Sequence, residues 1–537
     1  MRYTTIYKSL RWAVITPALS FSLLLLSTSC EDQVMELDPM DRISEVAAFA
    51  TAERAELAMI GVYDAAQSGF YAGGATVSRG YPFGAASIEQ GDTRGEDVVN
   101  LQAFYQITYE NSYNASTANN QYMWENLYAV INKANVVIEG VQTAATNNII
   151  TPEKALEYEG EARFLRALSH HELLVHFARP YNHTPDASHL GVPYRTMAVN
   201  TPAKVDEAKT QGRNTVKECY DLLLEDLNFA ETNLPATRTA NMITRATQGA
   251  AIAIKTRVLL HKQDFSGVIS EGDKLVPTAG ALVSPVGGYK LTATPEGPFT
   301  ATGNKSNTES IFSIENSATD NPGTNGALSQ MYGAGGRFLI AISPIIYNAT
   351  FWPADDLRRT QLTMQSASTG LQHTTKYKDV STWSDNAPVI RYAEVLLNLS
   401  EALARTTPLS TRAVELLNAV RSRATASYAL TDMASNDDLI QAIVNERRIE
   451  FLAEGLRWKD IHRLAVEGKY VYKGIPNKVA PTGLATADYS AASGTVRQAL
   501  LASIPAVPYE DFRFIWPIPL TEVNANPVLA EQQNPNY

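Results

Sequence analysis

Residues 158–178 read YEGEARFLRALSHHELLVHFA, and this stretch decides the fold. Its 3.6-residue periodicity predicts a helix that is apolar around most of its circumference. The side chains responsible are Phe164, Leu165, Leu168, Leu174, Val175 and Phe177. A helix on a protein surface carries one apolar stripe, whereas a helix that is apolar on most sides is buried among neighbours. The stretch therefore predicts a helix packed between other helices.

Several other segments carry helical periodicity. In residues 121–140 one apolar stripe is formed by Trp124, Leu127, Tyr128, Ile131, Ala134 and Ile138. Further helices are predicted at 153–178, 215–232, 245–262, 388–405, 410–424, 437–454 and 457–466. Short links join many of them into pairs, which favours a helical-hairpin array of the tetratricopeptide type, although no regular 34-residue repeat is present. The predicted fold is mainly α, with a tetratricopeptide-like helical scaffold spanning about 121–266 and 388–466.

Three long stretches lack this periodicity: 65–120, 277–385 and 467–537. They are rich in Gly, Pro, Thr, Asn and Ser, and contain only short strand-like runs such as Ser310–Ile314. They are too long to be simple connectors, and long irregular segments on a rigid scaffold commonly carry binding sites. We expect them to form a large, loop-rich ligand-binding lobe within a single domain spanning 30–537.

The N-terminus has the order of a secretory signal, with Arg2, Lys8 and Arg11 followed by an apolar run at 12–26 and small residues at 27–29. The apolar run is shorter than the roughly 20 residues that span a bilayer. Cys30 follows directly, as in a bacterial lipoprotein signal, in which the thiol receives a diacylglycerol and the chain is cut before it. We expect a signal peptide at 1–29 and lipid attachment at Cys30; the alternative is an ordinary cleaved signal.

Composition excludes several classes of function. The chain has 537 residues, ample for a large core, and a net charge of −11. No basic run is interleaved with aromatic residues, so nucleic acid is not expected as a partner. Apart from Cys30 the only cysteine is Cys219, so neither a disulfide framework nor a cysteine metal site is predicted. Because Cys219 lies in a predicted helix, we expect it to be buried and inert.

Blocks throughout the chain resemble the SusD/RagB family of Bacteroidetes surface lipoproteins. The resemblance rests on Trp124-Glu-Asn-Leu-Tyr128, Ile131-Asn-Lys-Ala-Asn135, Gly160-Glu-Ala-Arg-Phe-Leu-Arg-Ala-Leu168, Arg391-Tyr-Ala-Glu-Val-Leu-Leu397, Leu417-Asn-Ala-Val-Arg-Ser-Arg423, Glu446-Arg-Arg-Ile-Glu-Phe451, Glu454-Gly-Leu-Arg457, Asp460-Ile-His-Arg463, Pro517-Ile-Pro519 and Gln533-Asn-Pro-Asn-Tyr537. These blocks occur in the family's order from one end of the chain to the other.

The resemblance implies a binding protein and not an enzyme. Such proteins hold nutrients, mostly oligosaccharides, and act as a lid on a SusC-like TonB-dependent transporter. It implies a lipid anchor at Cys30 in the outer membrane, and Glu31 and Asp32 resemble the acidic signal for export to the cell surface. It implies no cofactor and leaves a second ligand class open, because the RagB branch takes up peptides.

Two patterns could be mistaken for catalytic sites. Glu446, Glu450 and Glu454 alternate with arginines at helix spacing, which favours structural ion pairs over a glycosidase carboxylate pair. A surface hydrolase using Asp355 or Asp356 with Asp385 is the remaining enzymatic alternative. His171 and His176 are five residues apart, so they diverge by about 140° on a helix and do not match the zinc-binding i, i+4 spacing.

The ligand contacts of the family come from two loop regions and follow no fixed motif. Sugars pack their C–H faces on aromatic rings while polar side chains bond the hydroxyls. The candidates in this sequence are Phe70, Tyr71, Arg79, Tyr81, Phe83, Tyr332, Tyr347, Trp352 and Trp383. By contrast, Trp124, Trp458 and Trp516 lie within the family blocks, and we expect them in the core.

Overall fold

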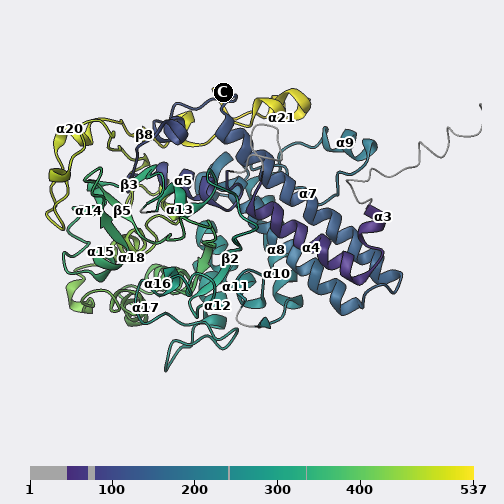
Figure 1. Cartoon of the computed structure of the whole chain (residues 1–537), viewed down its shortest axis with the longest axis horizontal. Helices are drawn as coiled ribbons and strands as arrows, with labels where there is room; N and C mark the ends of the chain where they lie inside the picture. The colour runs from purple at the N-terminus through teal and green to yellow at the C-terminus, as the bar shows by residue number, and fades with distance from the viewer. Residues whose placement is uncertain (1–44, 70–78, 240–241, 334) are drawn as a thin grey trace, which may run out of the picture.

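The computed structural model describes residues 45–69, 79–239, 242–333 and 335–537 (Figure 1). The predicted signal peptide, the predicted lipid-attachment residue Cys30 and the candidates Phe70 and Tyr71 lie outside the described residues. In the described part of the chain, no helix combines the length and the apolar character needed to cross a membrane.

Long helices of the first half of the chain lie side by side (Figure 1). They are α4 (Ala52–Gln67), α7 (Ala118–Thr146), α8 (Pro152–Phe177), α10 (Val216–Asn233), α11 (Gln248–Lys262) and α12 (Phe265–Leu275). Helix α8 packs against both α7 and α10, and 20 of its residues are buried. The prediction of a helix enclosed by neighbours is therefore confirmed.

The second helical group lies next to the first, because α11 and α12 of the first group both pack against α16 of the second. Its members are α16 (Tyr392–Thr406), α17 (Thr411–Arg421), α18 (Asn436–Glu450) and α19 (Leu456–Leu464). Local signals set the helix ends: Thr151 accepts a hydrogen bond from the amide of Lys154, and Pro152 opens α8. At α10, Thr215 and Glu218 form a capping box.

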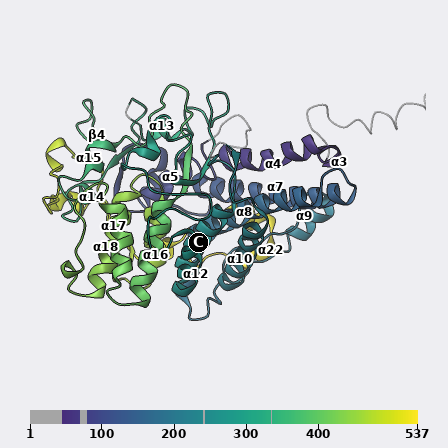
Figure 2. The ribbon, with the colours of Figure 1, turned by 90° about the horizontal axis from the view of Figure 1, so that it is seen from below.

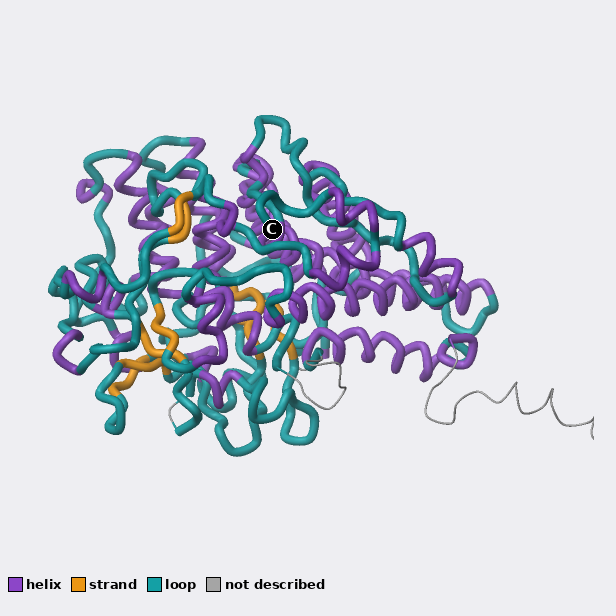
Figure 3. Tube along the Cα trace, turned by 90° about the horizontal axis from the view of Figure 1, so that it is seen from above, coloured by secondary structure: helices purple, strands orange, loops and turns teal. Residues whose placement is uncertain are grey.

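The remaining elements are short, and Figure 3 shows the strands scattered among loops in one half of the molecule. The helices are α3 (Glu45–Ala48), α5 (Ala85–Thr93), α6 (Gln106–Tyr109), α9 (Pro202–Ala208), α13 (Leu328–Met331), α14 (Pro344–Tyr347), α15 (Leu357–Gln361), α20 (Gln498–Leu501), α21 (Leu520–Ala525) and α22 (Pro527–Glu531). Four antiparallel pairs join β1 (Val98–Asn100) to β3 (Ile340–Ile342), β2 (Ser310–Ile314) to β6 (Ala387–Arg391), β4 (Thr363–Gln365) to β5 (Gln372–Thr374), and β7 (Gly474–Ile475) to β8 (Val507–Pro508).

The mainly α fold is confirmed, with local differences from the prediction. The helix expected from residue 388 begins at Tyr392, because residues 387–391 pair with β2 as strand β6. Helices α4 and α12 were not predicted. Strand β2 matches the predicted Ser310–Ile314 run. Cys219 is buried as expected, and its burial raises the pKa of the thiol to about 12.

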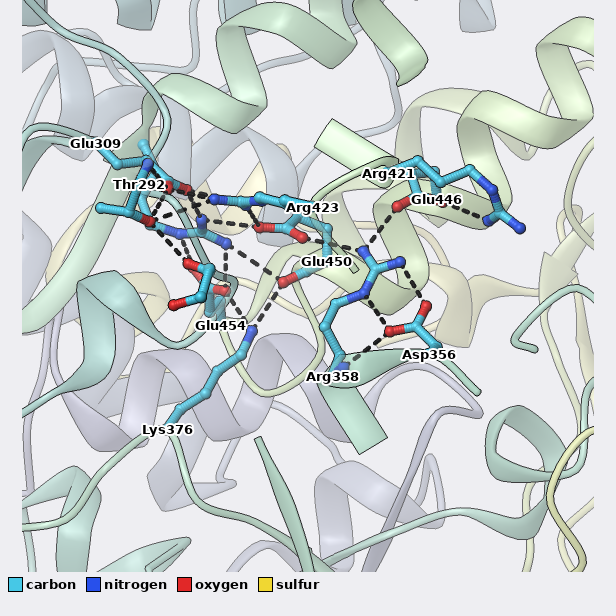
Figure 4. A network of polar contacts seen from close by, with 12 residues as sticks. Thr292, Glu309, Asp356, Arg358, Lys376, Arg421, Arg423, Glu446, Glu450 and Glu454 are labelled. Atoms are coloured by element: carbon cyan, nitrogen blue, oxygen red, sulfur yellow. Dashed lines mark hydrogen bonds and ion pairs between the residues drawn. The ribbon is translucent and has the colours of Figure 1, made fainter. Parts of the chain in front are cut away.

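A buried network of charged side chains connects the loops to the second helical group (Figure 4). Arg358 donates to Glu446 at 2.7 Å and to Glu450 at 3.0 Å, and it pairs with Asp356 at 2.8 Å. Arg391 donates to Glu454 at 2.8 Å and to Glu450 at 3.0 Å. These partners come from loops, α15, β6 and α18, so the prediction of structural ion pairs is confirmed.

Candidate ligand-binding face beside helix α5

Four of the predicted ligand contacts are core residues and do not form an outward-facing arc. Tyr81 is 0% exposed, Phe83 5%, Tyr332 1% and Trp352 1%. Three of them make a polar contact in the interior. The hydroxyls of Tyr81 and Tyr332 form hydrogen bonds, and the guanidinium of Arg359 lies 4.2 Å from the ring centroid of Trp352. Burial of a large ring contributes more to stability than exposure to solvent, so these loop aromatics pack inward.

Helix α5 nevertheless brings together candidates from both predicted loop regions. The side-chain amide of Gln90 donates to the Tyr81 hydroxyl at 2.9 Å. The Tyr332 hydroxyl donates to Asp92 Oδ2 at 2.5 Å, across 240 positions of sequence. Tyr81 and Tyr332 therefore position α5, and the chain segments that carry them approach the surface beside it.

Close backbone contact holds these two loops together. Gly80 adopts φ +76°, and a Cβ atom on it would lie 2.8 Å from the carbonyl oxygen of Gly326. A side chain at position 80 would thus be strained twice, by its backbone conformation and by this contact. Figure 2 shows α13 among irregular loops along one edge of the molecule.

An accessible aromatic group lies at this junction, and we call it the Phe104 surface: Arg79, Phe104, Asn325 and Arg337. Phe104 is half-buried, with the guanidiniums of Arg79 and Arg337 at 4.2 Å and 5.8 Å from its ring centroid. The exposed Arg337 donates to Asn325 Oδ1 at 2.6 Å. The surface thus combines a ring face with donors and an amide, which is the chemistry that binds sugars.

Only Arg79 of this group was predicted. Phe104 lies in the predicted loop region 65–120, but as a single aromatic next to Tyr105 it carries no signal that distinguishes a surface ring from a buried one. Tyr105 is in fact 1% exposed. Arg337 and Asn325 come from the second loop region, and only folding brings them to Phe104.

Two buried carboxyl groups lie behind the surface on α5. Burial raises the pKa of Glu89 well above its usual range, and the neighbouring Asp92 raises it further, although Tyr105 opposes the shift. Burial also raises the pKa of Asp92 to about 7, against the lowering effects of Tyr332 and the Gly455 amide. The protonated form of Glu89 is therefore favoured, although the nearby Arg337 acts to lower its pKa.

The other two candidates lie on separate segments, Tyr347 at the end of helix α14 and Trp383 on a loop. Tyr347 is half-buried, and its ring centroid lies 5.9 Å from that of Trp352. Trp383 is half-buried at φ +60°, in a loop whose backbone carbonyls at Asp379 and Val380 accept from Ser329 and Gln330. These two bonds attach the Trp383 loop to α13, next to the segment that supplies Asn325 and Arg337.

Of the three carboxylates considered for catalysis, Asp355 is exposed and the other two have structural roles. Asp356 is 1% exposed and pairs with Arg358, whereas Asp385 accepts the backbone amides of Lys378 and Asp379 at 2.6 Å and 2.8 Å. The His176 ring stacks on that of Trp516 with 4.5 Å between ring centroids, and the ring centroids of His171 and His261 are 4.8 Å apart. Within the described residues, no three His, Cys, Asp or Glu side chains form a group suited to a metal ion.

Comparison with known proteins places these features in one family. The model of the SusD family matches residues 359–537, and a model described as starch-binding associating with outer membrane matches residues 75–260. The SusD-like protein P2 of Formosa agariphila is 24% identical over 404 residues, which is 67% of this chain and 74% of that protein.

Solved structures show the same architecture. A SusD superfamily protein from Bacteroides fragilis superposes with a TM-score of 0.73 at 26% identity, covering 89% of this chain and 99% of that one. A laminarin-binding SusD-like protein superposes with a TM-score of 0.65 at 20% identity, covering 91% and 100%. Two family models that match separate parts of the chain, residues 75–260 and 359–537, together with this shared fold, identify it: the chain belongs to the SusD/RagB family.

Proposed function

We propose that this protein is a lipid-anchored binding protein of the outer membrane that captures oligosaccharides at the cell surface. It delivers them to a SusC-like TonB-dependent transporter. The observation that carries the proposal is the Phe104 surface, where a half-exposed ring is flanked by two guanidiniums and an amide. The name of the laminarin-binding relative and the starch-binding family description support a carbohydrate ligand.

The physical basis is a division of roles between ring and rim. The C–H face of a pyranose packs on an aromatic ring, while guanidinium and amide groups bond its hydroxyls. Helix α5, with eight buried residues out of nine, gives the loops a rigid base. A preorganised ring loses little entropy on binding. Delivery to a transporter requires release, so the affinity is expected to be moderate.

The proposed anchor rests on the signal-like N-terminus that ends at Cys30, and the proposed partner rests on the resemblance to the SusD/RagB family. Acylation of Cys30 would hold the protein in the outer membrane through two or more chains, each buried methylene contributing about 0.8 kcal/mol. Energy for uptake would come from the transporter. Metabolic labelling with a fatty-acid probe, compared between the natural chain and Cys30→Ala, tests the anchor; labelling that persists in the variant would contradict it.

The ligand class is tested by isothermal calorimetry of residues 31–537 against laminarin, starch, plant and microbial polysaccharides, and a peptide digest. Saturable heat with one glycan and none with peptides is the expected result. Heat with peptides alone would assign the protein to the peptide-binding branch of the family. Slow release of reducing sugar from the bound glycan over hours would instead indicate a hydrolase.

A further inference from the structure

A cavity lies between the loop that follows α8 and the C-terminal tail, near the chain end marked in Figure 1. Its volume is about 480 Å³, within the range of roughly 300–1,000 Å³ typical of small-molecule sites. It shares no lining residue with the Phe104 surface. The residues that matter for its chemistry are Arg179, Leu190, Arg213, Tyr509, Phe512 and Ile515.

Two guanidiniums line this cavity without a carboxylate partner. Arg213 is 9% exposed and donates only to neutral oxygens: the carbonyls of Gly191 at 2.6 Å, Gln532 at 2.8 Å and Leu190 at 3.1 Å, and Asn534 Oδ1 at 2.9 Å. Arg179 donates to the carbonyls of Tyr509 and Asp511. Among the described residues, neither arginine forms an ion pair with an acidic side chain.

The cavity lining carries two guanidiniums and also the carboxyl groups of Glu510 and Glu531. Burial lowers the pKa of Arg213 to about 10, and burial also lowers that of Arg179, but both groups remain charged at neutral pH. A buried charge is costly unless it is paired. Elsewhere in this chain the buried Arg358 and Arg391 are surrounded by carboxylates. An anion entering this cavity would meet two guanidiniums that, among the described residues, no carboxylate contacts directly, although Glu510 and Glu531 also line the cavity.

The neighbouring histidines add hydrogen-bonding groups and no charge. His183 Nδ1 lies 2.8 Å from the Tyr509 hydroxyl, and burial lowers the pKa of His183 to about 4. His189 Nε2 lies 3.1 Å from the carbonyl of Arg179, so this nitrogen must be the one that carries the proton. Burial lowers the pKa of His189 as well.

The walls are apolar and aromatic. Tyr509 and Phe512 contribute rings, and Leu190 and Ile515 contribute aliphatic groups. Two of the five N–H donors of Arg179 bond carbonyls, which leaves three for a ligand, whereas Arg213 uses its donors on the chain itself. We propose that this cavity binds a small aromatic carboxylate, with its ring against Tyr509 and Phe512 and its carboxylate toward Arg179.

A residue at the rim of the cavity allows the sign of the ligand's charge to be tested. Glu510 is exposed, pairs with Lys473 at 3.0 Å and lines the cavity beside Arg179. Because its negative charge opposes an incoming anion, Glu510→Gln is expected to tighten binding by about twofold. Loss of affinity in that variant would contradict an anionic ligand.

The probe is 4-hydroxybenzoate, titrated by calorimetry into the soluble full chain at low salt. Its methyl ester and 4-hydroxybenzyl alcohol have the same ring without the charge. Saturable binding of the acid, at least tenfold tighter than either neutral analogue, is the expected result. Equal affinity for acid and ester, or no saturable heat with the acid, would overturn the proposal.

Two variants locate the binding. Arg179→Gln removes the positive charge of this side chain. It is expected to weaken binding of the acid at least tenfold and to leave the affinity for the ester unchanged. Leu190→Trp fills the cavity from its exposed rim, since Leu190 is 38% exposed, and is expected to abolish binding in a chain that melts normally. Tyr472→Ala, at a 45% exposed ring outside the cavity, is the control. Binding that survives Leu190→Trp would place the ligand elsewhere.

Discussion

Two sets of buried carboxyl groups in this molecule have opposite charge states. In the network of Figure 4, burial opposes ionisation of Glu450, but Arg423, Arg391 and Arg358 outweigh it and hold its pKa well below the usual range. On α5, Asp92 is equally buried, yet its neighbours include a tyrosine and a backbone amide, and its pKa rises to about 7. Burial alone therefore does not set charge; the partners do.

The comparison separates two structural roles. The charged network joins β6, α18 and the loops at 309 and 356–358, so removing one partner leaves several charges uncompensated. The α5 carboxyls lie behind the Phe104 surface, where Asp92 accepts from the Tyr332 hydroxyl and burial favours the protonated form of Glu89. The first region ties loops to the second helical group, and the second underlies the candidate binding surface.

The largest expected effect is the loss of stability when the charged network of Figure 4 loses one cation. Arg391→Leu removes a cation that contacts Glu309, Glu450 and Glu454 together, and losing one partner of a buried pair costs about 3–5 kcal/mol. The free energy of unfolding in urea measures the loss. Arg412→Leu, which removes a more exposed pair with Asp273, is the matched control and should cost about 0–1 kcal/mol. Equal losses would contradict the role of the network.

A second pair of variants tests the opposite charge states. The pKa of Asp92 is about 7 in the folded chain and about 3.9 unfolded, so the native state holds more protons between these values. Stability from this group is thus lost as pH rises from about 4 to 7. Asp92→Asn imitates the protonated acid: its carbonyl oxygen still accepts from the Gly455 amide, and its NH2 group donates to the Tyr332 hydroxyl in place of accepting from it. Because this variant does not titrate, it should gain on the order of 1–4 kcal/mol at pH 8.

Glu450→Gln should behave in the reverse sense. The depressed pKa of Glu450 contributes stability above the unfolded pKa of about 4.3, and this contribution is lost as pH falls through the folded value. The glutamine variant is therefore destabilised at pH 7. Thermal melts of both variants at pH 5 and pH 8 provide the comparison, and a gain for Glu450→Gln at pH 8 would refute the assigned charge states.

The smallest expected effect concerns Glu89. Because its raised pKa favours the neutral acid, Glu89→Gln replaces one uncharged group by another of similar shape. We expect a change in the free energy of unfolding below about 1 kcal/mol at pH 6. Glu309→Gln, which removes a charge that Arg391 and Arg423 both contact, is the contrasting control and should cost more. The reverse order would mean that Glu89 is ionised.

The sequence was most informative where periodicity is strong and least where contacts are distant. The stripes of α7 and α8 predicted their helices, and the alternation of Glu450 and Glu454 with arginines predicted ion pairs. The partners could not be predicted, because Arg391, in strand β6, binds carboxylates on helix α18 and on a distant loop. Likewise, Tyr81 and Tyr332 were expected outside because nothing in an irregular segment states which way a ring points.

The most direct test of the account compares two exposed-ring variants of residues 31–537 by calorimetry with the glycan that the natural chain binds. Phe104→Ala removes the ring of the Phe104 surface, and Tyr472→Ala removes a ring elsewhere that is 45% exposed. The account predicts at least a tenfold loss of affinity, about 1.4 kcal/mol, for Phe104→Ala alone, with both variants melting normally. Undiminished binding by Phe104→Ala would contradict it.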